Sequence, residues 1–250
     1  MDLRRQCLKQ GYGIFGKAYE IMFRNDLHAL ESIDHAFLRD MVLLDDESAP
    51  VLYGNPPMKY DMRNHELYEF SQQFRGSADR ETIRNVLDYT SGIAMSYDLD
   101  FKEMLFGGTE KEILERGTDW CADMARVGAV LLQCLDIPCR IISLVNLEKA
   151  YNGHVVGEAF YEGKYGLVDF IYGYQMLSDR PVSARDIQEN LTLLDSYPEE
   201  YRGMFSGIAV NEYDPTNPDN DYTVSKPNEY YMKLIYEDHH DQWIMGEDRA

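Results

Sequence analysis

Three residues that can perform acyl transfer together occur in order along the middle of the chain. Cys121 stands in the segment TDWCADMA, His154 in GHVV and Asp169 in LVDF. A thiolate attacks carbonyl carbons, an imidazole moves protons, and a carboxylate fixes the imidazole tautomer. These residue types predict a Cys-His-Asp triad, with Cys121 as nucleophile, His154 as base and Asp169 as the orienting group.

The surroundings of Cys121 favour a reactive thiol. Residues 121–135 are apolar nearly all round, which predicts a central buried helix, and Gly117 marks the loop that enters it. A cysteine at a helix N-terminus sits at the positive end of the helix dipole, beside backbone N–H groups without partners. Both features favour the thiolate, and the same amides can bind an oxyanion.

A β-hairpin would bring His154 and Asp169 together. Residues 154–161 and 165–170 are rich in β-branched and aromatic types, and Glu162-Gly163 lies between them as a two-residue turn. This register sets Asp169 opposite Val156, so the imidazole and the carboxylate are diagonal neighbours on one face. A bulge at Gly157 would change that parity.

The remaining elements define an α+β fold, with helices first and then a small antiparallel sheet packed on one central helix. We expect a helical N-terminal subdomain at 1–80, a catalytic core at 81–175 and a C-terminal extension at 176–250, all packed as one unit. Further expected elements are helices at residues 3–45, His65–Phe74, Ala184–Leu194 and Glu229–Tyr236, a break at Gly107-Gly108 and a strand at Arg140–Val145.

An ordered set of short motifs between Glu81 and Tyr172 resembles the transglutaminase-like superfamily, whose members have a papain-type fold. A helix leads to a Tyr-Asp segment, a glycine and a cysteine open the central helix, and Asp-Ile-Pro-Cys-Arg follows it. Then come a Gly-His strand with a nearby glutamate, a Tyr-x-Gly-Lys-aromatic turn and a closing Val-Asp. The residues that carry these motifs are Ile93–Asp98, Gly117, Cys121, Asp136–Arg140, Gly153, His154, Glu158, Tyr161–Tyr165, Val168 and Asp169.

The resemblance implies thiol chemistry at amide bonds: transamidation, amide or peptide hydrolysis, removal of amide-linked sugars, or amide formation. Cys121, His154 and Asp169 match the nucleophile, base and orienting positions. The chain departs from the family pattern at Tyr165, where tryptophan is common, at Phe170, where proline is frequent, and in the longer spacing from His154 to Glu158. These departures leave the substrate class open.

Composition excludes several function classes. The chain has 250 residues and a net charge of −20, with 44 % hydrophobic residues. It is long enough for a large hydrophobic core. Its charge argues against nucleic acid and anionic membranes as partners, because both require clustered Lys and Arg. The sequence has no secretory signal pattern, no apolar run of about 18 residues and no paired C-x-x-C cysteines, so we expect a reduced cytoplasmic protein.

Each candidate residue also has a structural interpretation. Cys121 could be a buried structural thiol, as we expect Cys134 and Cys139 to be. The sequence around Cys7 indicates neither a structural nor a reactive role. Trp120 either shapes the substrate pocket and donates its indole N–H toward the oxyanion, or simply packs. Glu158 either contacts the substrate region or satisfies neighbouring strand groups.

No cofactor or metal is expected. The acidic run at 214–221 is similar to a calcium loop but lacks the glycine and the terminal glutamate that such loops use, so a solvated turn is the better interpretation. His239-His240 has no matching ligand pair nearby and is interpreted as surface charge.

Two functions remain open. The first is a thiol-dependent amidase, protease or acyltransferase that acts on a peptide, amide or amine-bearing substrate, with a carrier-protein thioester as a further acyl donor. The second is a non-catalytic binding module or adaptor on the same fold.

Overall fold

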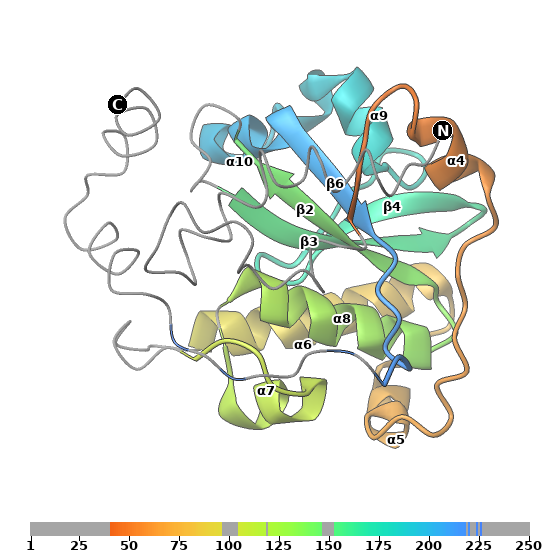
Figure 1. Ribbon diagram of the computed structural model, residues 1–250, viewed down its shortest axis with the longest axis vertical. Coiled ribbons are helices and arrows are strands. Elements are labelled where there is room, and N and C mark those ends of the chain that lie inside the picture. Colours follow the sequence, from red (N-terminus) through yellow and green to blue (C-terminus); the bar gives the residue numbers. More distant parts are fainter. Residues whose placement is uncertain are drawn as a thin grey trace.

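The computed structural model describes residues 41–96, 105–118, 120–146, 153–218, 220, 224 and 226. Within this part of the chain the strands form one six-stranded sheet in the order β1-β6-β2-β3-β4-β5, and every neighbouring pair is antiparallel (Figure 1). The strands are β1 (Met41–Leu43), β2 (Cys139–Val145), β3 (Gly153–Tyr161), β4 (Lys164–Asp169), β5 (Tyr174–Gln175) and β6 (Gly207–Asn211). Helices and an antiparallel sheet together confirm the expected α+β class.

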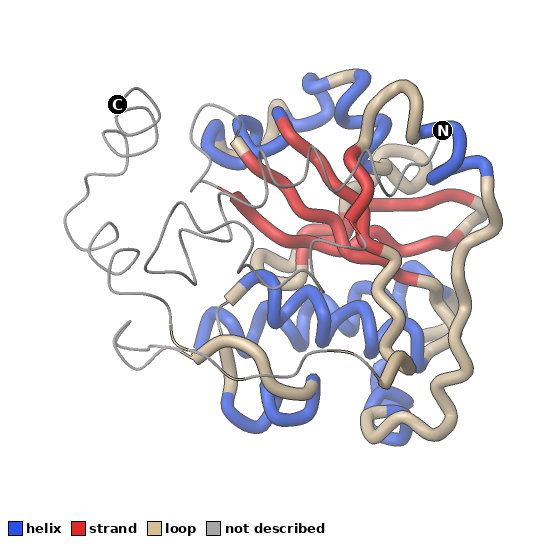
Figure 2. Tube along the Cα trace, viewed as in Figure 1, coloured by secondary structure: helices blue, strands red, loops and turns tan. Residues whose placement is uncertain are grey.

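Helices cover both faces of this sheet (Figure 2). On one face lie α5 (Tyr68–Ser71), α6 (Asp79–Ser96), α7 (Glu110–Arg116) and α8 (Cys121–Cys134), with the 3-10 turn η2 (Gln72–Phe74). On the other lie α4 (Ala49–Gly54), α9 (Ala184–Glu189) and α10 (Glu199–Gly203), with the 3-10 turns η4 (Leu191–Leu194) and η5 (Met204–Ser206).

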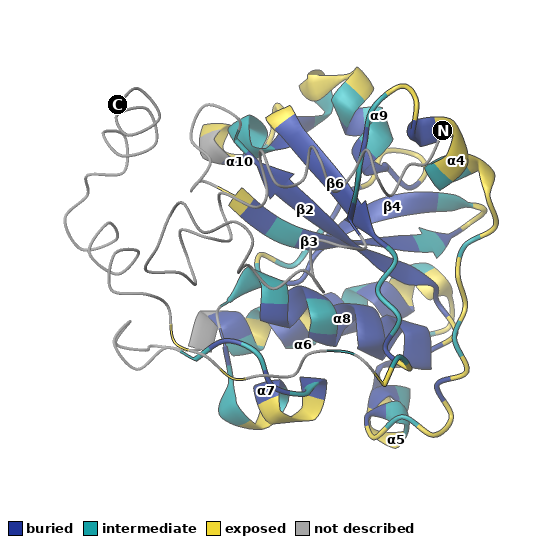
Figure 3. Cartoon of the chain, in the orientation of Figure 1, coloured by how far each residue is buried: buried dark blue, intermediate teal, exposed yellow. Residues whose placement is uncertain are grey.

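The central strand β2 is buried along its whole length because it contributes to two hydrophobic cores. Ile141 packs on the α8 side, whereas Ile142 and Leu144 pack on the side of α9 and η5. In Figure 3 the buried residues are concentrated on the sheet and on α8. A strand that is buried on both faces has a continuous apolar run in its sequence, as RIISLV does here.

The β3–β4 hairpin has the predicted register. Tyr161 pairs with Lys164 and Gly157 with Val168, so β3 has no bulge at Gly157. The turn residues Glu162 and Gly163 have φ of 52° and 77°, the positive values that a two-residue hairpin of this type requires.

Phe170 occupies a space that two glycines leave open between α8 and β3. A Cβ atom on Gly128 would lie 2.2 Å from the Phe170 ring, and one on Gly157 would lie 2.6 Å from it. Real side chains do not approach so closely, so both positions require glycine while Phe170 is present. The residue after Asp169 therefore helps to fix the distance between the central helix and the sheet.

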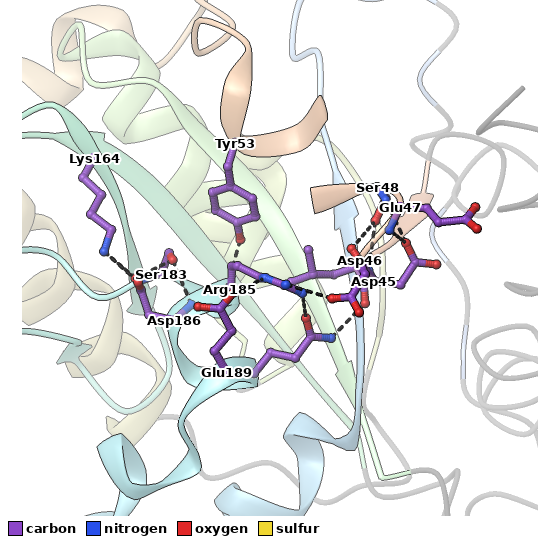
Figure 4. Close-up of polar contacts among 12 residues, drawn as sticks. Asp45, Asp46, Glu47, Ser48, Tyr53, Lys164, Ser183, Arg185, Asp186 and Glu189 are labelled. Atoms are coloured by element: carbon purple, nitrogen blue, oxygen red, sulfur yellow. Dashed lines mark hydrogen bonds and ion pairs between the residues drawn. The ribbon is translucent and has the colours of Figure 1, made fainter. Parts of the chain in front are cut away.

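On the opposite face, the segment after β1 is tied to α9 (Figure 4). The Arg185 guanidinium bonds to Asp46 at 2.9 Å, and the Arg185 backbone N–H donates to the Tyr53 hydroxyl at 3.3 Å. Ser183 and Asp186 form a capping box that begins α9, and Lys164 of β4 pairs with Asp186 at 2.7 Å. Residues far apart in the sequence therefore form one side of the molecule.

Some expected elements differ from the structure. Residues 41–43, expected to continue an N-terminal helix, form β1, because pairing with β6 satisfies their backbone groups. The helix expected at 65–74 is confined to α5 and η2, and the one at 184–194 is split into α9 and η4 at Asn190, whose extended backbone ends the first.

The expected domain boundaries remain a prediction, although β1 and β6 from the two flanks share the sheet of the core. The helices expected at 3–40 and 229–236, and Tyr97-Asp98 of the family motif, lie outside the described residues. Among the helices that the structure describes, none has both the length and the apolar character of a membrane span.

Candidate active site

The hairpin places His154 beside Asp169. His154 is the second residue of β3 and Asp169 the last residue of β4, and Nε2 of the imidazole lies 2.8 Å from Oδ2 of the carboxylate. Both side chains are buried, with 7 % of His154 and none of Asp169 exposed. The diagonal contact predicted from the turn is therefore present.

Asp169 is held by donors on both of its oxygens. Oδ1 accepts the backbone N–H groups of Ile171 and Tyr172 at 2.9 and 3.1 Å, and Oδ2 also accepts the Tyr201 hydroxyl at 3.0 Å. Burial opposes ionisation, but the charge of His154 and these hydrogen bonds outweigh it and lower the pKa of Asp169 below its ordinary value. The carboxylate is thus an anion held in one orientation.

Cys121 is the first residue of α8, is partly exposed, and lies near enough to the His154 ring to influence its charge. Burial lowers the pKa of His154, but Asp169 and Cys121 together raise it to about 10. The raised pKa favours the protonated imidazole, which has one N–H donor on each ring nitrogen, and Nε2 uses its donor for Asp169.

The residue in front of Cys121 does not cap α8 with its own side chain. Trp120 is the N-cap residue in an extended conformation, and its side chain makes no capping hydrogen bond. Its own N–H donates to Thr118 Oγ1 at 2.9 Å. The first N–H groups of an α-helix have no acceptor within the helix, so they can bind an oxygen that develops negative charge next to the sulfur.

Trp120 packs beside this N-terminus. Its ring lies edge-on to buried Phe106, with the centroids 4.3 Å apart. This contact fixes the indole next to Cys121 and fits the packing interpretation. A substrate role for Trp120 stays a prediction.

Two buried ion pairs hold the first turns of α8 against α7 and the loop before it. Asp123 pairs with Arg116 at 3.2 Å and accepts the Gly107 N–H, while Arg126 pairs with Glu110 at 2.9 Å. Burial raises the pKa of Asp123 to about 6, although the nearby arginines lower it. The chain near Gly107-Gly108, expected to break regular structure, has positive φ at both glycines and anchors the helix that carries Cys121.

Glu158, considered for substrate contact, is held by several protein donors. It is completely buried, and its carboxylate accepts from Arg140 Nε at 2.8 Å, the Ala184 N–H at 2.7 Å and the Tyr53 hydroxyl at 3.0 Å. These contacts fit the interpretation that Glu158 satisfies neighbouring groups, and a substrate role for it stays a prediction. Tyr165, one of the departures from the family pattern, belongs to the same cluster and stacks on the Arg140 guanidinium at 3.7 Å.

The other cysteines that the structure describes have the expected burial. Cys134 and Cys139 are buried, and burial raises the pKa of Cys134 to about 12. Asp214 accepts the Thr216 N–H and hydroxyl in a turn, and the described residues contain no group of three or more candidate metal ligands. Cys7, Asp219, Asp221 and His239-His240 lie outside the described residues.

Tyr201 is the residue that sequence reasoning missed. It lies 32 residues after Asp169 in an acidic, tyrosine-rich stretch, and no motif singles it out. Its ring stacks on that of Tyr197 at 5.8 Å, but Tyr197 lies in the bend before α10, so a helical spacing does not explain the contact.

Comparisons with known proteins give little further information. No protein-family model and no curated protein matches the sequence. A solved structure of a candidate cysteine protease from Cytophaga hutchinsonii matches 51 % of this chain and 43 % of its own, with 20 % identity and a TM-score of 0.36. A similarity this limited carries no argument about the site, so a function has to be inferred from the geometry of Cys121, His154 and Asp169.

Proposed function

We propose that this protein is a cysteine-dependent enzyme that transfers an acyl group from an amide or thioester carbonyl to water or an amine. The supporting observation is the buried His154–Asp169 pair beside Cys121, with the sulfur on the first residue of α8 and the carboxylate fully buried. The transglutaminase-like motifs of the sequence place the same three residues in the same roles.

The geometry supports a two-step reaction. The Cys121 thiolate attacks the carbonyl carbon, and the N–H groups at the start of α8 stabilise the oxyanion. The bond to the leaving amine or thiol breaks as His154 gives it a proton, which leaves a thioester on Cys121. His154 then takes a proton from water or an amine, which attacks the thioester and releases the acyl product and the thiolate. Asp169 holds the imidazole in the tautomer that both steps need.

The substrate class follows from this chemistry only in part. A peptide, a small amide or the thioester of a carrier protein can each supply the acyl group. Hydrolysis and transfer use the same residues and differ in which acceptor reaches the thioester. Water and an amine can therefore be compared as acceptors on the same acyl-enzyme.

Thiol alkylation tests the proposal without knowledge of the natural substrate. Native protein is treated with iodoacetamide between pH 5 and 9, and the modification of each cysteine is measured by peptide mass spectrometry. An ordinary thiol ionises near pH 8.5. We expect Cys121 to react faster in native protein than in unfolded protein, since His154 lies beside its sulfur. Buried Cys134 in the same sample is the internal control, and urea-unfolded protein gives the rate of a free thiol.

The acyl-enzyme itself is the second readout. Incubation with an activated thioester should add one acyl group to Cys121 in the intact mass, and none to a Cys121→Ala protein. Added hydroxylamine or an alkyl amine then shows whether the acyl group goes to the amine or to water. If Cys121 in native protein reacts no faster at pH 6 than in unfolded protein and forms no thioester, the enzyme proposal fails and the binding-module alternative gains.

A further inference from the structure

Tyr201 of α10 reaches the candidate active site from outside the region of the sequence motifs. Its side chain is 3 % exposed, and its hydroxyl lies 3.0 Å from Asp169 Oδ2. The same oxygen accepts His154 Nε2 at 2.8 Å. The phenol therefore contacts the carboxylate on the side that faces the imidazole, while backbone N–H groups hold the opposite oxygen.

The packing of α10 fixes this hydroxyl in place. The Tyr201 ring stacks on Tyr197 at 5.8 Å, contacts Phe205 at 5.5 Å and meets the His154 ring edge-on at 5.9 Å. Burial, with the charge of Asp169, raises the pKa of Tyr201 well above 10. The phenol consequently keeps its proton and remains a donor to Asp169 throughout the range in which proteins are folded.

We propose that Tyr201 is a positioning residue of the active site, whose hydroxyl binds the Asp169 oxygen facing His154 and so extends the series to Cys121–His154–Asp169–Tyr201. This inference rests on the proposed function, since it concerns the same three side chains. It assigns to the C-terminal region a role in the chemistry as well as in packing.

The physical consequence is that Tyr201 shares the charge of Asp169 with His154. A hydrogen bond to a carboxylate stabilises its negative charge and weakens the pull of that charge on a neighbouring cation. Without the phenol, Asp169 would hold the imidazolium more tightly. His154 must release its proton to the leaving group, so a donor that limits this attraction favours the acylation step.

The titration of His154 reports this effect directly. The charged and titratable groups that face the ring are Cys121 from α8, Asp169 from β4, Tyr172 from the segment after β4 and Tyr201 from α10, with Tyr197 and Tyr174 behind Tyr201. Labelling with ¹⁵N-histidine and NMR between pH 5 and 11 gives the midpoint for each ring, and a His154→Gln protein assigns the signal. The full chain is used throughout.

The decisive comparison is between Tyr201→Phe and Tyr161→Phe. Each removes one hydroxyl from a buried ring, but the Tyr161 hydroxyl accepts from Gln175 at 3.3 Å, far from the triad. We expect the His154 midpoint to rise by about half a pH unit in Tyr201→Phe and to stay unchanged in Tyr161→Phe. An unchanged midpoint in Tyr201→Phe overturns the proposal. A lower midpoint also overturns it, because it would mean that the phenol does not compete with His154 for the charge.

A second variant keeps the ring and the hydroxyl in place should Tyr201→Phe fail to fold. Site-specific 3-fluorotyrosine at position 201 is a stronger donor, so the His154 midpoint should fall by a few tenths of a pH unit, opposite in sign to Tyr201→Phe. Alkylation of Cys121 distinguishes the two proposals. A rapidly reacting Cys121 with no change of midpoint removes only the role of Tyr201, whereas an unreactive Cys121 removes the proposed function.

Discussion

Strand β3 contributes His154 and Glu158, four residues apart on the same face, to two buried ion pairs. The pairs differ in whether the basic partner can lose its proton and in whether it lies next to Cys121. Glu158 pairs with Arg140, and His154 pairs with Asp169. All four side chains are nearly or completely buried. The first pair belongs to the core between α4 and α9, whereas the second lies next to the partly exposed Cys121.

The difference between the pairs lies in the basic partner. The charge of Glu158 helps to raise the already high pKa of Arg140, so this charge is permanent, and the remaining Glu158 contacts come from a phenol and a backbone amide. His154 can lose its proton, and its ring has a second nitrogen for Cys121. A buried pair can therefore supply or take up a proton when one partner titrates and also lies beside a thiol, whereas burial by itself gives only a fixed charge.

The largest effect expected from this comparison is on reactivity. In His154→Gln the amide can still bond to Asp169, but it cannot hold a proton for Cys121. We expect alkylation of Cys121 at pH 6 to slow by about 100-fold, measured by peptide mass spectrometry. Rapid alkylation in His154→Gln would contradict the role of the imidazole.

The other pair should affect stability without affecting reactivity. Glu158→Gln leaves the buried Arg140 charge without its main partner, at a cost of about 3 kcal/mol in the free energy of unfolding. This corresponds to a fall of about 6–12 °C in Tm, measured by calorimetry. Alkylation of Cys121 in the folded fraction should be unchanged. If Glu158→Gln slowed alkylation as strongly as His154→Gln, the two pairs would not be independent.

The pH dependence of stability should also separate the pairs. The pKa of His154 is raised from 6.5 to about 10, so its pairing stabilises the folded state fully below pH 6.5, and this contribution is lost as pH rises through 10. The difference in unfolding free energy between wild type and His154→Gln should therefore shrink from pH 6 to pH 10 in urea titrations. The corresponding difference for Glu158→Gln should stay constant, because Arg140 does not titrate in this range.

The smallest effect is expected from Tyr53→Phe. It removes the phenol that donates to Glu158 at 3.0 Å but leaves the Arg140 pair intact. We expect a loss of about 1 kcal/mol in urea unfolding and no change in Cys121 alkylation. A loss as large as that of Glu158→Gln would show that the phenol, rather than the ion pair, stabilises this cluster.

Local signals in the sequence were sufficient for the hairpin and the central helix. A two-residue Glu-Gly turn has one natural register, and that register determines which residues share a face with His154. The apolar run after Cys121 likewise predicts a buried helix from local sequence alone, because its pattern does not depend on distant partners.

Long-range features were not predictable in this way. The strand β1 has three residues, and its pairing with β6 depends on backbone groups rather than on side-chain pattern. The enclosure of Glu158 requires Tyr53, Arg140 and Ala184 to meet from three separate elements, and Tyr201 depends on the placement of α10. Nothing in the local sequence of any of these residues specifies its partner.

The position of β6 between β1 and β2 has a consequence for folding during synthesis. Met41 pairs with Asn211, so the sheet closes only after residue 211 has left the ribosome. At about 5–20 residues per second, Cys121 then precedes residue 211 by about 5–18 seconds and Asp169 precedes it by about 2–8 seconds. Until that moment β2 lacks one neighbour and Asp169 lacks its phenol donor. The nascent chain thus carries all three triad side chains before it has the scaffold that holds them.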